Sequence, residues 1–67
     1  MSNQVLHHTS LKHYRVTLIS VKDGYRVSQT FDGTADGDSG HDDYDTAYAE
    51  FLAWSAAVVE KEQAALA

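Results

Sequence analysis

Six aspartates stand between Phe31 and Asp45, in the stretch FDGTADGDSGHDDYD, together with three glycines and no lysine or arginine. Carboxylates at this density suit coordination of a hard cation, attraction of a basic partner, or acid–base catalysis. Asp, Gly and Ser are also the ordinary residues of solvated turns. The sequence therefore predicts an acidic loop over residues 32–43 and makes it the candidate functional segment.

Calcium coordination is one chemistry that the spacing allows. The segment resembles the calcium loop of EF-hand proteins, which places oxygen ligands at alternate positions, a glycine sixth and a bidentate acid twelfth. Gly37 is sixth and Asp43 twelfth when counting starts at Asp32. The segment departs from the pattern because a predicted strand precedes it and its last acid is a short Asp. The resemblance implies a calcium-binding module as an alternative function, with ligands from Asp32, Thr34, Asp36, Asp38 and Asp43.

Catalytic readings are weaker. Gly37-Asp38-Ser39-Gly40 resembles the nucleophile loop of trypsin-like proteases, but those enzymes need a large scaffold that brings His and Asp from distant segments. A tuned acid–base pair likewise needs a rigid, buried frame. The histidines match no common zinc spacing, and the chain has no cysteine to add a thiolate. We therefore expect a non-enzymatic protein without a cofactor. The histidines are His7, His8, His13 and His41.

The chain is small and needs additional stabilisation. Its 67 residues make one domain, and a chain of this size buries only about 60% of its unfolded surface. Small domains usually add disulfides, a metal or a partner, and the absence of cysteine removes the first of these. We expect a homodimer, a flexible segment over 1–10 and a single domain over 11–67. The sequence shows no signal peptide or membrane span, which favours a cytoplasmic protein.

Charge divides the chain into two unequal parts. Residues 1–31 carry four basic residues and one acid, whereas residues 32–67 carry one basic residue and nine acids. The formal net charge of −5 argues against general affinity for nucleic acid, which requires neutralisation of phosphates. The basic residues lie in a segment, about 12–31, that is predicted below to be a hairpin. Its Tyr14 and Tyr25 could stack on bases, which keeps nucleic-acid binding through this basic hairpin as a second alternative.

Two β-strands are predicted at about 12–22 and 25–31, because both segments are rich in β-branched and aromatic residues. Asp23-Gly24 between them is a strong hairpin signal. A two-residue turn there pairs Lys22 with Tyr25, and a three-residue turn pairs Val21 with Tyr25. The first register, which we prefer, gathers bulky apolar side chains on one face of the hairpin. These side chains are Tyr14, Val16, Leu18, Tyr25, Val27 and Phe31.

A C-terminal amphipathic helix is predicted over about 45–64. Asp45 is the preferred N-cap and Asp43 the second choice. Apolar residues recur at helical spacing from Tyr44 to Val59, with Trp54 at the margin of the apolar face. The fold class is therefore α+β, a ββα unit that packs its helix on the hairpin and dimerises.

Protein recognition is the function that these features favour. The hairpin is apolar on both faces, and Trp, Tyr and Arg are enriched at interface hot spots. An acidic surface can imitate the phosphates of DNA and occupy a basic nucleic-acid-binding surface, as small inhibitors of the phage or mobile-element type do. We expect a small acidic protein-binding module, acting as an inhibitor or DNA-mimicking accessory protein. The expected partner-binding residues are Asp36, Asp38, Asp42, Asp43, Trp54, Arg15 and Tyr25.

Overall fold

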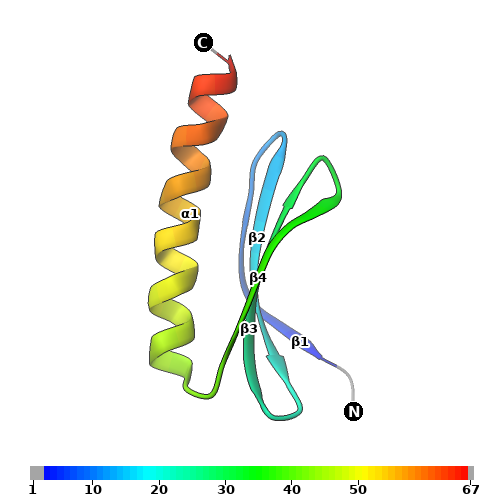
Figure 1. Ribbon diagram of the computed structural model, residues 1–67, viewed down its shortest axis with the longest axis vertical. Coiled ribbons are helices and arrows are strands. Elements are labelled where there is room, and N and C mark those ends of the chain that lie inside the picture. Colours follow the sequence, from blue (N-terminus) through cyan, green and yellow to red (C-terminus); the bar gives the residue numbers. More distant parts are fainter. Residues whose placement is uncertain (1–2, 67) are drawn as a thin grey trace.

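The computed structural model describes residues 3–66 and shows an antiparallel sheet with one helix along one of its faces (Figure 1). The strands pair in chain order, β1-β2-β3-β4, as a meander. The α+β class and the C-terminal helix are thus confirmed. No helix among the described residues is long and apolar enough to cross a membrane. The elements are β1 (Gln4–Ser10), β2 (Tyr14–Val21), β3 (Gly24–Phe31), β4 (Thr34–His41) and α1 (Tyr44–Leu66).

The β2–β3 hairpin has a different register from both predicted ones. Val21 pairs with Gly24 and Leu18 with Val27, so the turn residues are Lys22 and Asp23. The register is displaced by two residues from the preferred prediction, and a displacement of two keeps every side chain on its face. The predicted apolar face is therefore correct although its pairing is wrong. Gly24 lies after the turn rather than within it.

The largest correction concerns the acidic segment, most of which is a strand. Asp32 (φ 51°) and Gly33 (φ 83°) form a two-residue turn between the paired residues Phe31 and Thr34. Positive φ at both positions is the I′ hairpin turn that Asp-Gly favours. Residues 34–41 then form β4, the edge strand beside β3. The low β-propensity of Asp, Gly, Ser and Ala predicts a loop here, and the pairing with β3 overrides that propensity.

The beginning of the chain is also more ordered in secondary structure than expected. Residues 4–10 lie within the segment predicted to be flexible, and they form all of β1. They pair with β2 from Gln4 opposite Ser20 to Ser10 opposite Arg15, with a bulge between Val5 and His7. Residues 1–2 lie outside the described part of the chain. One chain therefore builds a four-stranded sheet without a second copy.

The core lies between α1 and the sheet. It consists of the buried residues Val16, Leu18, Val27, Ala47, Phe51 and Val58. The helix lies chiefly over β2 and β3, and its buried positions recur at the spacing expected for one helical face. The opposite face of the sheet carries Arg15, Thr17, Ile19 and Arg26. Among the described residues no element lies over this face (Figure 1).

Candidate binding site at the start of the helix

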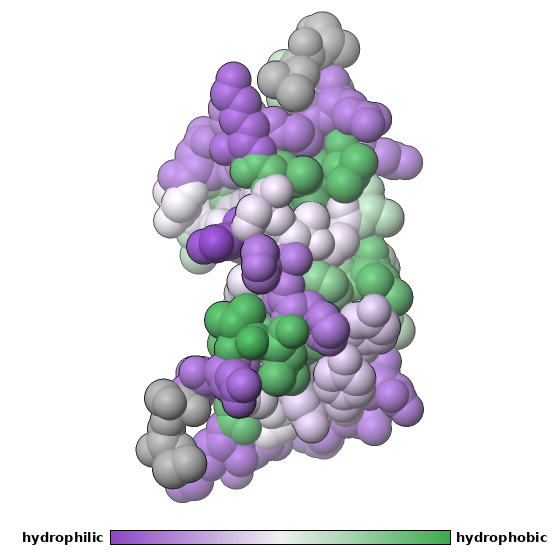
Figure 2. All heavy atoms as spheres, turned by 180° about the vertical axis from the view of Figure 1, so that it is seen from behind, coloured by the Kyte–Doolittle hydropathy of each residue, from purple (hydrophilic) through white to green (hydrophobic). Residues whose placement is uncertain are grey.

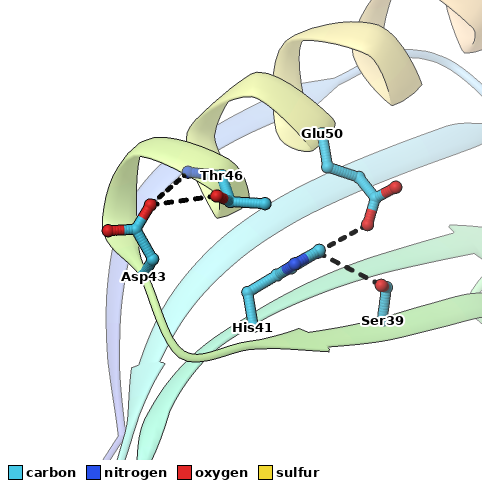
Figure 3. Close-up of polar contacts among 5 residues, drawn as sticks. All are labelled: Ser39, His41, Asp43, Thr46 and Glu50. Atoms are coloured by element: carbon cyan, nitrogen blue, oxygen red, sulfur yellow. Dashed lines mark hydrogen bonds and ion pairs between the residues drawn. The ribbon is translucent and has the colours of Figure 1, made fainter.

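The connection from β4 to α1 is organised by a capping aspartate. Asp43 Oδ2 accepts hydrogen bonds from the backbone N–H and the side-chain hydroxyl of Thr46, both at 2.9 Å (Figure 3). Asp43, the second choice for the cap, is thus the residue that satisfies this free N–H group of the helix start. The hydrogen bonds from Thr46 lower the pKa of Asp43. The Asp43 carboxylate therefore stays ionised to a lower pH than an ordinary aspartate does.

One turn further along, Glu50 ties the helix to β4. Its Oε1 lies 2.5 Å from Nε2 of His41, and the same nitrogen lies 3.2 Å from Oγ of Ser39 (Figure 3). Hydrogen bonds from Ser39 and then His41 lower the pKa of Glu50. Since Ser39 and His41 are on β4 and Glu50 is on α1, this contact fixes the edge strand against the helix.

The Ser39–His41–Glu50 contact is not the relay of a serine hydrolase. In such a relay the serine and the acid contact opposite nitrogens of the imidazole ring. Here both lie at Nε2 of His41, and Ser39 belongs to a regular strand opposite Val27. The Gly-Asp-Ser-Gly resemblance is therefore confined to the letters, and the contact is a structural link.

An aromatic cluster surrounds the first turn of the helix; its members are His7, Tyr25, Tyr44, Tyr48 and Phe51. The Tyr44 ring stacks on that of Tyr48 with centroids 5.7 Å apart and meets Tyr25 edge-on at 5.6 Å. Its hydroxyl lies 2.8 Å from Nε2 of His7. Tyr44 is 36% exposed, so this rigid cluster presents an aromatic face to solvent.

Aspartates surround the same end of the molecule. Asp42, Asp43 and Asp45 flank Tyr44 in the chain, and all three are exposed. Gly24 lies against the backbone of His41 and Asp42, which brings the β2–β3 turn and its exposed Asp23 to this end. We call Asp23, Asp42, Asp43, Asp45 and the aromatic cluster the helix-start site. The site combines four carboxylates with tyrosines held by mutual packing.

The predicted partner-binding residues do not form one surface. Arg15 lies on the uncovered face of the sheet, and Asp38 lies there with Oδ2 2.6 Å from Nη1 of Arg26. Asp36 occupies a bulge and accepts a 2.7 Å hydrogen bond from Gln29. Trp54 packs over Gly37, on the helix side of β4. Of the predicted set, the structure brings together Tyr25, Asp42 and Asp43.

The predicted calcium ligands are also separated. Asp32 and Asp43 lie beyond opposite ends of β4, whose eight residues span about 26 Å at the usual rise of a strand. Within residues 3–66 no group of three or more His, Asp or Glu side chains is arranged to hold a metal ion. These ligands do not surround one ion in this fold.

A second polar contact, absent from the predictions, lies at the other end of the molecule. His13 Nδ1 is 2.9 Å from Oδ1 of Asp32, and the His13 backbone N–H donates to Oε1 of Glu62 over 3.0 Å. Glu62 is buried, and its Oε2 has no hydrogen-bond partner among the described residues. The contact anchors the end of the helix to the β1–β2 and β3–β4 turns.

Sequence reasoning missed the role of Tyr44, Tyr48 and His7 in the helix-start site. The string His41-Asp42-Asp43-Tyr44-Asp45 contained a usable signal, since aspartates are almost never fully buried and keep the tyrosine among them near the surface. The contribution of His7 had no such signal, because it depends on β1 joining the sheet.

Comparisons with family models, curated proteins and solved structures found no match to this chain.

Proposed function

We propose that this protein is a small acidic, non-enzymatic binding module that recognises a basic protein surface through the helix-start site. The observation that supports it is the exposure of Asp42, Asp43 and Asp45 on either side of Tyr44 in the chain, with Tyr44 itself 36% exposed. Tyrosine rings attract Lys and Arg through cation–π contacts, and carboxylates attract the same side chains by charge. The two groups of residues thus favour the same partner chemistry.

Rigidity supports the proposal as well. The Asp43 cap, the His41–Glu50 contact and the stacked tyrosines hold the site before any partner arrives. Binding therefore requires little ordering, and prior ordering reduces the cost of association. The net charge of −5 would speed association with a basic protein and make it sensitive to salt.

The biological consequence we propose is inhibition. A module that covers a basic nucleic-acid-binding surface prevents that surface from contacting phosphates, which is the strategy of many phage and mobile-element inhibitors. The proposal differs from imitation of a DNA strand, because the four acids of the helix-start site gather at one end of the molecule rather than along a line. We further propose that the module acts as a homodimer.

The test uses a fluorescent peptide rich in Lys and Arg, titrated with the protein and followed by anisotropy at low and moderate salt. In the first variant Asp23, Asp42, Asp43 and Asp45 become Asn, which can still cap the helix. In the control variant Asp32, Asp36 and Asp38 become Asn and Glu60 becomes Gln, which removes the same charge elsewhere.

We expect the helix-start variant to weaken binding at least tenfold and the control to weaken it less than threefold. Equal weakening would mean that total charge alone binds the peptide, and the helix-start site would then be rejected. Binding of duplex DNA in a shift assay would favour the uncovered face, with its two arginines, as a nucleic-acid surface instead.

A further inference from the structure

The two edge strands of the sheet differ in their protection against pairing. Edge strands expose unpaired N–H and C=O groups, and proteins usually guard them with charges or bulges. The outer strand β4 carries Asp36 in a bulge and Asp38 beside it. The strand β1, QVLHHTS, contains no Lys, Arg, Asp or Glu. Its bulge lies near its beginning, and His7–Ser10 pair regularly with β2. The β1 edge is the less protected one.

Apolar side chains flank the β1 edge on both sides of the sheet. Ser55 Oγ lies 2.9 Å from Oγ1 of Thr9 in β1, so Ser55 marks the flank of α1 nearest to β1. Leu52 and Val59 lie three residues before and four after Ser55, and therefore on that same flank. They are 49% and 38% exposed. On the other face, Val5 is 55% exposed and lies opposite Ile19.

Figures 1 and 2 agree with this arrangement. Figure 1 draws β4 in front and β1 fainter behind it, so Figure 2 views the molecule from the side of β1. Green residues lie along the helix side in that view, and another green group lies near the beginning of the chain. Of the five exposed large hydrophobic residues in the described part of the chain, three lie in β1 or on the flank of α1 next to it. They are Val5, Leu52 and Val59.

We propose that β1 pairs antiparallel with β1 of a second copy, giving an eight-stranded sheet with both helices on one face. An added strand would lie about 4.8 Å beyond β1, beneath the flank that carries Leu52 and Val59 and beside Val5. The interface is isologous, because a two-fold axis brings the same surface of each chain together.

A second copy fits this edge better than a charged partner does. Because β1 has no charged side chain, its antiparallel pairing with itself opposes no like charges. Among the described residues the core contains only six buried hydrophobic side chains, and additional apolar burial is what so small a domain lacks. Asp23, Asp42 and Asp43 of the helix-start site lie at the β2–β3 and β4–α1 turns rather than on the β1 edge. The proposal goes beyond that site and does not rest on it.

Sedimentation of the purified full chain, without any partner, tests the proposal. Wild type at tens of micromolar is expected to sediment at twice the 7.4 kDa chain mass. The variant L52K/V59K is expected to be monomeric, with the helical circular dichroism of wild type. The control A53K/A64K adds the same charge at exposed positions on the outer side of α1 and should remain dimeric.

A second variant guards against a folding failure. H8E places an acid near the middle of β1, where it meets or neighbours its own copy across the two-fold axis, and should also dissociate the dimer. A monomeric wild type, or a dimer that survives in both L52K/V59K and H8E, would overturn the proposal. Because each chain carries −5, salt should strengthen self-association, whereas it should weaken binding of a basic peptide. Opposite salt responses keep the two proposals distinguishable.

Discussion

At Gly24 the backbone has φ of 153° and packs against the carbonyl oxygen of His41, leaving no room for a β-carbon. We predict that Gly24→Ala lowers the free energy of unfolding by at least about 2 kcal/mol, through strain and displacement of the β4–α1 connection. Gly40→Ala is the control, since a β-carbon there meets nothing within 4 Å and should change stability by less than about 1 kcal/mol. Urea unfolding of both variants measures the difference, and equal effects would contradict the assigned packing.

The carboxylates of Asp43 and Glu50 predict a dependence of stability on pH. Hydrogen bonds lower the pKa of each group below its ordinary value, 3.8 for Asp43 and 4.5 for Glu50. A group with a lowered folded pKa contributes stability above its unfolded pKa and loses it as pH falls through the folded one. We expect the melting temperature to decrease as the pH is lowered from about 5 to about 3.

The matched comparison for that pH dependence is Glu50→Gln. This variant should be less stable than wild type near pH 6, and the difference should shrink towards pH 3 as Glu50 becomes protonated in wild type. Thermal melts at stepped pH measure it. A difference that stays constant over this range would show that Glu50 acts through packing rather than through its charge.

The buried Glu62 holds the C-terminal part of the helix in place, because it joins the last turns of α1 to the β1–β2 turn. Removing the acceptor of the His13 N–H by Glu62→Ala should cost about 1–3 kcal/mol. Glu62→Gln keeps an acceptor oxygen and removes a buried charge whose Oε2 has no hydrogen-bond partner among the described residues and lies 4.0 Å from Nε2 of His13. We expect this variant to equal or exceed wild type in stability near neutral pH. Lower stability for Glu62→Gln, measured in urea, would mean that the charge itself is required.

Among the elements, β4 shows most clearly what the sequence could and could not predict. Its pairing with β3 begins at Asp32-Gly33, the same dipeptide signal that identified the β2–β3 hairpin. The strand itself was hidden because its residues are acidic or small. Small residues are tolerated there because Gly37 lies beneath the Trp54 ring and because an edge strand needs few buried side chains. For locating β4, the Asp-Gly turn was a more reliable signal than the composition of the strand.

The helix and the apolar face of the hairpin were predictable because each depends on a periodic pattern within one segment. The helix-start site was predictable only in part, since its acids are adjacent in sequence but its aromatic cluster draws on β1, β3 and α1. The acids of β4 are divided between surfaces, because Asp38 pairs with Arg26 on the uncovered face whereas Asp36 lies in the bulge beside Gln29.

For the molecule as a whole, the proposed dimer predicts a melting temperature that depends on concentration. Association of folded chains stabilises them by mass action, so the wild-type melting temperature should rise between 5 and 200 μM, roughly by a few degrees. L52K/V59K should melt at a temperature independent of concentration, while A53K/A64K behaves as wild type. Differential scanning calorimetry measures all three, and a wild-type temperature that does not move would argue against self-association.

The placement of Trp54 over Gly37 gives the molecule a built-in optical probe. The chain contains one tryptophan, and its ring covers β4, the last strand of the sheet and one of its two edges. Tryptophan emission should therefore report the departure of that last strand, whereas the far-ultraviolet dichroism of α1 reports loss of the whole fold. If β4 leaves first, the emission will shift at lower urea than the dichroism does, and the chain will unfold in two resolvable steps.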